Sequence, residues 1–383
     1  MTLLRDLVLS RGPAPSFAAM GLFWGAFAAL VPEIKPKAGL SDGGFGLAML
    51  VAACGAVMAM WLAPLAEARM GRHALPVATL AMAAAFLLPG LTTVGVAFAL
   101  SMTLASMASG TLDVVMNARV AAVEAGARRS LMNLNHAVFS VGYAFAAITA
   151  GLMREAQIPP ALVLACMSAL TVGLVWIGLG GWVPDPEAED STSGAPPLSW
   201  ALLLPGGAII LIAFLVEQAT EGWSALHLER NMGAGAAQGA LGPALLGITM
   251  AIGRLSGQAM AQRFTEASVI SCAATLSAAG AITAALADGL ALAYSGFAVL
   301  GLGVSVVAPM AFAWIGRLVP ARHRTHAIAR ISVVGYAGFF IGPPMMGFLS
   351  EGFGLQASFS AVSLLLLVVP LALVPLLARR TMA

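Results

Sequence analysis

Long apolar runs, interrupted by charged residues, glycines and prolines, dominate this chain of 383 residues. A helix needs about 20 mostly apolar residues to cross the hydrocarbon core of a bilayer. Dividing the sequence at its charges and Gly/Pro clusters yields twelve such segments, six in each half. They lie near 15–33, 43–64, 74–91, 94–118, 131–153, 158–182, 200–223, 237–261, 268–287, 289–316, 327–350 and 355–378. The pattern predicts an all-α membrane protein with twelve transmembrane helices.

One sizeable polar segment, Pro184–Pro197, separates the sixth predicted helix from the seventh. It reads PDPEAEDSTSGAPP, with four acidic residues, four prolines and no basic residue. That composition is typical of a solvated linker rather than of a packed element. We therefore expect a six-helix bundle over 1–183, a linker over 184–199 and a second six-helix bundle over 200–383.

Composition excludes several classes of protein. Apolar residues make up 60% of the chain and charged residues only 9%, against about 25% charged residues in ordinary globular proteins. The net charge of +2 leaves no clustered basic face of the kind that nucleic acid requires. The three cysteines have no CxxC spacing, so we expect no metal site, no cofactor and no disulfide framework. Each lies in an apolar run and is expected to be buried.

Basic residues are unevenly distributed over the two sides of the predicted membrane protein. With the N-terminus inside, fifteen of the nineteen lie on the cytoplasmic side or at helix ends facing it, and four lie opposite (Lys35, Lys37, Arg154 and Arg230). An excess of Lys and Arg marks the cytoplasmic side. The distribution predicts that both termini and the linker are cytoplasmic.

Short similarities between the two halves suggest an internal repeat. SVGYA at Ser140–Ala144 recurs as SVVGYAG at Ser332–Gly338, and GGFGLAML at Gly43–Leu50 resembles GALGPALL at Gly239–Leu246. The two offsets, 193 and 196 residues, are about half the chain. Matches between equivalent helices favour a parallel six-plus-six repeat.

The connection between the second and third predicted helices carries a recognisable motif. Pro64–His73 reads PLAEARMGRH and resembles the Gly-x-x-x-Asp-Arg-x-Gly-Arg-Lys signature of the major facilitator superfamily. Arg69, Gly71 and Arg72 fit that signature, whereas Pro64 and Ala68 stand where it has Gly and Asp. The resemblance makes Arg69 and Arg72 gating candidates.

Four further segments resemble a sugar-permease-like bacterial branch of this superfamily: Leu112–Glu124, Asn133–Ala144, Glu221–Leu228 and Gly335–Glu351. The resemblance implies two bundles that rock about a central cavity, often driven by protons. It implies a monomer in the bacterial inner membrane that transports a small-molecule solute.

Polar residues inside the fourth and fifth helices are candidates for proton coupling. Asp113 and Asn117 share one helix face, as do Asn133, His136 and Tyr143 on the next helix. The two helices are antiparallel neighbours, so we expect Asp113 and His136 at similar depth. A partly desolvated carboxylate near an imidazole can bind or release a proton near neutral pH. The alternative for Asn117 and Asn133 is an interhelical polar clamp; otherwise they and Tyr143 line the substrate cavity.

The seventh helix carries two acidic residues one turn apart, Glu217 and Glu221, ahead of Trp223. We interpret Trp223 as an interfacial anchor, which would place Glu221 at the outer boundary as a solvated cap or a cavity residue. Glu217 lies one turn deeper and is a candidate for binding substrate or protons. Trp24 and Tyr336, the counterpart of Tyr143 in the repeat, are further cavity candidates, although packing against lipid or the core is the favoured explanation for Trp24.

Two arginines, Arg254 and Arg330, lie toward the cytoplasmic ends of the eighth and eleventh helices. Their side chains can extend into the headgroups or pair with a polar group of the other bundle, near Asp113 or His136. A pair of that kind would open and close with the bundles, which makes both arginines gating candidates.

The sequence favours a secondary transporter of a small polar, sugar-like solute, coupled to protons. The alternative is a proton-coupled exporter of amphipathic compounds. An enzyme is disfavoured because His136 has no second histidine at metal-ligand spacing and no nucleophile–base motif is present. A channel is disfavoured because no filter-like loop is visible.

Overall fold

The computed structural model describes residues 2–179, 200–319 and 323–381, and these residues form helices and no strands. Helices satisfy their own backbone hydrogen bonds, which a lipid environment requires. The elements are α1 Thr2–Leu9, α2 Ala14–Lys37, α3 Asp42–Met70, α4 Ala74–Ala85, α5 Gly95–Ala127, α6 Met132–Glu155, α7 Pro160–Gly178, α8 Trp200–Met232, α9 Ala236–Gly239, α10 Leu241–Arg263, α11 Glu266–Leu286, α12 Leu290–Leu318, α13 Arg324–Val368 and α14 Val374–Thr381. Short 3-10 turns cover Gly71–His73 and Pro89–Leu91, and a π-helical turn covers Val369–Leu373.

Ten helical runs of the described residues are long and apolar enough to cross a membrane. Two of these runs, 42–91 and 326–379, each hold two of the predicted helices. The first is interrupted at Gly71 (φ 51°) and the second at Gly354 (φ 83°). A positive φ suits glycine because it has no Cβ, so both sites allow the chain to leave one helix and start the next. The described residues thus contain the twelve predicted passes.

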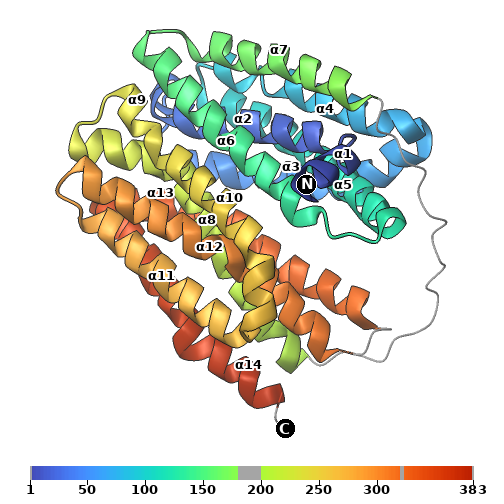
Figure 1. Ribbon diagram of the computed structural model, residues 1–383. Helices are drawn as coiled ribbons and strands as arrows, with labels where there is room; N and C mark the ends of the chain where they lie inside the picture. Colours follow the sequence, from blue (N-terminus) through green and yellow to red (C-terminus); the bar gives the residue numbers. More distant parts are fainter. Residues whose placement is uncertain (1, 180–199, 320–322, 382–383) are drawn as a thin grey trace.

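The helices form two bundles, α2–α7 and α8–α14, which lie side by side in Figure 1. The helices of both bundles meet near α9, at the left of Figure 1, and diverge toward the opposite side. We name the first end the α9 end and the second, where α1 begins and α14 finishes, the termini end. The predicted linker over 184–199 lies entirely outside the described residues, so the boundaries of the two domains stay a prediction.

Glycines allow helices of the two bundles, and helices within one bundle, to approach closely. A Cβ on Gly25 of α2 would lie 2.0 Å from the carbonyl oxygen of Tyr143 in α6. A Cβ on Gly46 of α3 would lie 2.6 Å from the carbonyl oxygen of Pro343 in α13, which belongs to the other bundle. Such small residues drive close helix packing in membranes. The contact at Gly46 therefore depends on the closed arrangement of the α9 end.

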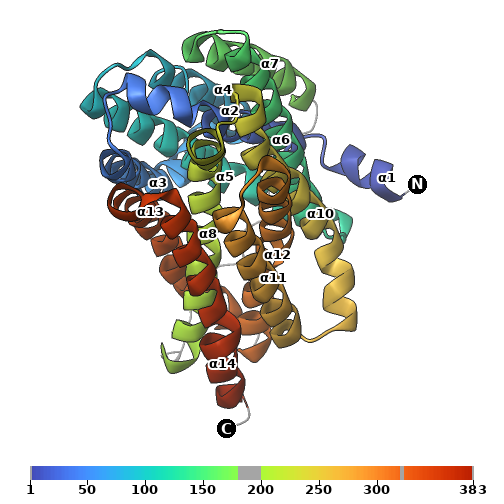
Figure 2. The same cartoon turned by 90° about the vertical axis from the view of Figure 1, so that its left-hand side faces the viewer.

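A short helix that the hydropathy pattern does not predict, α1, precedes the first bundle and projects from it in Figure 2. Arg129, in the connection between α5 and α6, holds it by an ion pair from Nε to Oδ1 of Asp6 at 2.7 Å. Eight residues are too few to span a bilayer, which explains its absence from the predicted spans.

Two packing expectations are wrong. Trp223 is not an interfacial anchor, because α8 continues to Met232 and the Trp223 side chain is 1% exposed, edge-on to Phe45 of the other bundle. Cys54 and Cys272 are exposed on the protein surface rather than buried. Hydropathy explains both errors, since lipid-facing surface and bundle core are equally apolar.

Candidate functional site

The centre of the interface between the bundles holds an arginine that contacts both of them. Arg254 of α10 donates from Nη2 to Oε1 of Glu217 on α8, at 3.0 Å. Its Nη1 donates to Oγ of Ser140 on α6, at 2.5 Å, and lies 3.4 Å from the carbonyl oxygen of His136. The guanidinium is thus shared between an acidic residue of its own bundle and the backbone and hydroxyl of the other.

A small cavity lies between the bundles, next to Glu221. One amide and one carboxylate face it, Gln218 and Glu221, and their closest contact is 3.4 Å from Nε2 to Oε2. Aromatic and apolar side chains complete the wall: Trp24, Phe27, Ala28, Phe45, Met49, Trp223 and Pro343. Two of the predicted cavity residues, Trp24 and Glu221, therefore line an inter-bundle cavity.

Tyr143, on α6, adds a buried hydroxyl next to the cluster of Arg254, Glu217 and Ser140, which we call the polar centre. Its side chain is 1% exposed, and its hydroxyl has no hydrogen-bond partner among the described residues. The charges of Glu217 and Glu221 act on this hydroxyl across the interface. A buried hydroxyl without a partner is energetically unfavourable, and it is available to a solute or a water molecule.

Asp113 and His136 are not brought together by a hydrogen bond or ion pair in the described part of the chain. Asp113 accepts a hydrogen bond from Nδ2 of Asn117 at 2.9 Å. The His136 ring instead packs edge-on against Phe17, with 5.1 Å between ring centroids. Asp113 lies within electrostatic range of Tyr336 on α13 of the other bundle. The expected Asp113–His136 pair is thus replaced by a separate contact for each residue.

The remaining candidates occupy less central positions. Asn133 lies in the first turn of α6 and is partly buried. Arg330 places its guanidinium 5.8 Å from the ring centroid of Trp200, a residue of its own bundle. A cation–π contact of this kind stabilises the arginine without a partner from the other bundle.

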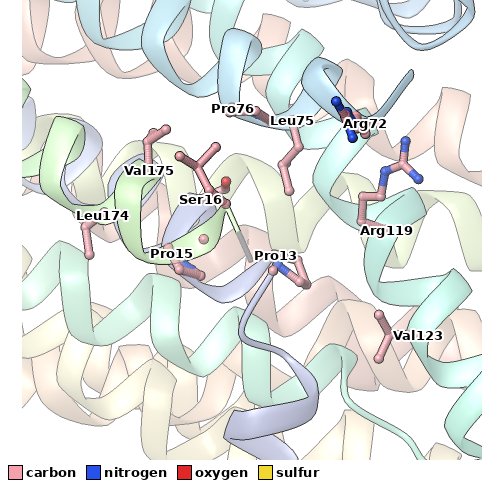
Figure 3. A pocket seen from close by; sticks show the side chains of 13 residues that line it. Pro13, Pro15, Ser16, Arg72, Leu75, Pro76, Arg119, Val123, Leu174 and Val175 are labelled. Carbon is pink, nitrogen blue, oxygen red and sulfur yellow. The ribbon is translucent and has the colours of Figure 1, made fainter. Parts of the chain in front are cut away.

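The motif between α3 and α4 lies at the termini end, beside a second cavity shown in Figure 3. Arg72 and Arg119 lie at one side of this cavity, and apolar residues of α2, α4 and α7 form the other walls. Arg119 contacts the carbonyl oxygen of Gly71 at 3.4 Å and Glu67 at 3.9 Å. Arg69 is exposed, and Arg72 donates to the His73 ring at 3.1 Å. The motif arginines therefore lie at the termini end, outside the polar centre.

Sequence reasoning missed a set of charged contacts that joins the bundles at the α9 end. Asp42, at the start of α3, accepts from Lys35 at 2.7 Å, from Arg230 of α8 at 2.8 Å, and from the Ser350 hydroxyl of α13. Glu351 accepts from the Ser41 hydroxyl at 2.9 Å. Arg230, Ser350 and Glu351 belong to the second bundle, so their contacts with Asp42 and Ser41 join the two bundles at this end, whereas Lys35 pairs with Asp42 within the first bundle.

A second charged contact lies beside the first. Arg154, at the end of α6, forms a two-pronged ion pair with Glu229 of α8, at 2.8 and 3.1 Å. The Arg154 side chain is 7% exposed, and its Nε lies 3.6 Å from Glu33. At the termini end, by contrast, Arg129 pairs with Asp6 and Arg317 with Glu266, each within one bundle. In the sequence these charged residues only mark the ends of helices, but in the structure they join the two bundles.

Comparison with known proteins identifies the family. A family model described as Major Facilitator Superfamily matches residues 207–382. An uncharacterized transporter of this superfamily from Yersinia pestis is 31% identical over 360 residues, covering 92% of each chain.

Solved structures show the same fold. A bacterial homolog of the human lysosomal transporter Spinster, in an inward-facing and occupied conformation, superposes with a TM-score of 0.76 at 16% identity, covering 98% of this chain and 97% of that one. A D-xylose–proton symporter superposes with a TM-score of 0.69 at 15% identity, covering 96% of each chain. The Yersinia pestis relative shows the family, and the matching family model and the twelve-pass fold agree with it. The chain therefore belongs to the major facilitator superfamily and is a multi-pass membrane transporter rather than an enzyme.

Proposed function

We propose that the protein is a proton-coupled secondary transporter that moves a small polar solute by alternating access through the cavity beside Glu221. The observation that carries this proposal is the position of Arg254, which binds Glu217 of one bundle and Ser140 of the other. Rocking of the bundles changes the contact between Arg254 and Ser140 and leaves the contact between Arg254 and Glu217 in place. A proton on Glu217 would weaken its ion pair with Arg254 and free the guanidinium to bind elsewhere. Protonation and movement therefore act on the same side chain.

The charged contacts at the α9 end support an inward-facing arrangement. Asp42 with Arg230, and Arg154 with Glu229, join the bundles at that end. The excess of basic residues at the termini end favours that end as the cytoplasmic one. The protein would then be closed toward the outside of a bacterial inner membrane, and its opening outward must break these ion pairs. The inward-facing Spinster homolog has the same fold.

Proteoliposomes loaded with a pH-sensitive dye test the proposal. Addition of a transported solute should change the internal pH, and an imposed pH gradient should drive uptake of the same solute. A panel of sugars, nucleosides and amines should contain at least one solute that does this with wild-type protein and not with protein-free liposomes. A complete lack of solute-dependent proton flux across the panel would contradict proton-coupled transport.

We expect Gly46→Ala to shift the protein toward the state in which the α9 end is open. The added methyl group would lie 2.6 Å from the carbonyl oxygen of Pro343 in the closed state. Overpacking costs about 1–3 kcal/mol, which shifts the equilibrium by about 5- to 150-fold. Spin labels on Leu91→Cys and Asp288→Cys, in a variant without Cys54, Cys166 and Cys272, report the separation of the bundles at that end.

The matched control is Gly126→Ala, since nothing lies within 4 Å of the position that a Cβ on Gly126 would occupy. It should leave the distance distribution unchanged. If Gly46→Ala gives the same distance distribution as Gly126→Ala, the contact between α3 and α13 does not change during the cycle.

The proposed orientation predicts opposite labelling of two exposed positions. In the same cysteine-free background, an impermeant thiol reagent added to intact cells should modify Asp288→Cys, between α11 and α12. It should not modify His73→Cys, between α3 and α4, until the membrane is permeabilised. Modification of His73→Cys from outside would reverse the orientation and place the α9 end in the cytoplasm.

A further inference from the structure

The cavity between the bundles combines a carboxylate with aromatic walls. Four of its lining residues are aromatic (Trp24, Phe27, Phe45 and Trp223), and only Glu221 is charged. The ring faces of aromatic residues carry partial negative charge, which attracts cations. A site for a neutral sugar would be expected to present several hydrogen-bonding groups, but this cavity presents only Gln218 and Glu221.

Glu221 has no basic partner at ion-pair distance in the described part of the chain. Its one hydrogen bond comes from the Gln218 amide, at 3.4 Å. The nearby guanidinium, that of Arg254, is bound to Glu217 and Ser140. A carboxylate away from bulk water is costly unless it is paired or neutralised. Glu221 is therefore open to a positively charged ligand from the cavity side.

One aromatic ring of the cavity, that of Trp24, is held in position by its neighbours before any ligand binds. The indole nitrogen of Trp24 donates to Oγ of Ser109 at 3.0 Å. Phe27 and Phe86 pack edge-on against the same ring, with centroid separations of 5.9 and 5.3 Å. A ring fixed in this way loses little conformational entropy on binding.

We propose that this cavity binds an organic cation, a small solute with an ammonium group, in which Glu221 is the counter-ion and Trp24 is the aromatic wall. The inference rests on the proposed function, because it assigns a substrate class to the same transport cavity. Charge balance supports it, since two acidic side chains (Glu217 and Glu221) and one guanidinium (Arg254) lie close together beside the cavity. A cation entering the cavity reduces the excess negative charge, whereas an anion would increase it.

Equilibrium dialysis of the purified protein tests this inference without any transport measurement. The probes are labelled tetramethylammonium, choline and benzyltrimethylammonium. The matched ligand control is 3,3-dimethylbutan-1-ol, in which carbon replaces the nitrogen of choline and the shape is retained. We expect at least one cation to bind saturably, and the neutral isostere to compete at least about tenfold more weakly than choline.

Variants distinguish the cavity from other sites. Glu221→Gln keeps the shape of the side chain and removes its charge, so it should weaken cation binding by at least about tenfold. Trp24→Leu should weaken it as well, by a smaller factor. Asp288→Asn removes one acidic residue from an exposed loop and should bind as the wild type does. Near-UV circular dichroism and thermal unfolding check that each variant is folded.

Three results would overturn the inference: equal binding of the isostere, unchanged binding by Glu221→Gln, or no saturable binding of any of the three cations. None of them decides whether the protein is a proton-coupled transporter. That question depends on solute-driven proton flux, which neutral solutes can also produce. Conversely, saturable cation binding without proton flux would support the cation site and contradict proton coupling.

Discussion

Glu217→Gln is expected to abolish solute-driven proton flux while the protein remains folded. The amide keeps the size of the side chain and can still accept a hydrogen bond from Arg254, but it cannot carry charge or exchange a proton. Arg254 would lose the ion pair at 3.0 Å in a partly buried place where its remaining contacts lie on the other bundle. Leaving a buried charge without its partner costs about 3–5 kcal/mol, equivalent to about 100-fold or more in an equilibrium constant.

A double-mutant cycle shows whether Glu217 acts through Arg254. We expect Arg254→Gln to lose transport as well, and the double variant to be no worse than either single variant, because residues of one network are not additive. Asp288→Asn, an exposed acidic residue at the α9 end, is the matched control and should transport normally. Proton flux in Glu217→Gln equal to that of wild type would remove Glu217 from the mechanism. Fully additive losses would mean that the two residues act separately.

The fold could be predicted from the sequence because the bilayer constrains it so strongly. A segment such as Ala14–Lys37 must be helical in lipid, since no water satisfies its backbone. Length and hydropathy then fix the number of passes, even where α13 continues through Gly354 without a loop. Hydropathy does not show which face of a helix points toward the other bundle and which points toward the outer surface. Trp223 and Cys54 are both apolar residues of predicted spans, yet one lies between the bundles and the other on the outer surface.

The individual residues of the candidate site could be predicted from the sequence, but the contacts between them could not. An acidic residue in a transmembrane helix, such as Asp113 or Glu217, is conspicuous because it is expensive there. Its partner depends on how the two helices are rotated about their axes, and that rotation places the His136 ring against Phe17 rather than Asp113. The contact between Asp42 and Arg230 joins residues 188 positions apart. In the sequence both look like ordinary charges at helix ends, and nothing in the local pattern connects them.

Asp113→Asn is expected to separate solute movement from proton-driven accumulation. The amide oxygen of Asn can accept the same hydrogen bond that Asn117 donates to Asp113 at 2.9 Å, so the fold and the local packing should be retained. The substituted side chain cannot titrate. Exchange of labelled solute at equal pH should therefore continue. Accumulation of the solute, which in the wild type can reach about tenfold for each pH unit of the gradient and each proton transported, should disappear.

The reason to place a proton at Asp113 is its position relative to the other bundle. It lies within electrostatic range of Tyr336 on α13, and rocking of the bundles changes that distance. We expect the same movement to change the exposure of this carboxylate to water, and because the free energy of its charged form depends on that exposure, its proton affinity would differ between the two states. By reciprocity, a proton bound at Asp113 shifts the balance between the states.

The matched comparison is Asn117→Ala, which removes the hydrogen bond to Asp113 and leaves the carboxylate able to titrate. We expect it to shift the pH dependence of accumulation and to retain coupling. If Asp113→Asn accumulates solute in response to a pH gradient alone, the proton is carried elsewhere, and Glu217 is then the remaining candidate. Loss of exchange together with accumulation would instead assign Asp113 to solute binding, because a residue needed only for coupling leaves exchange intact.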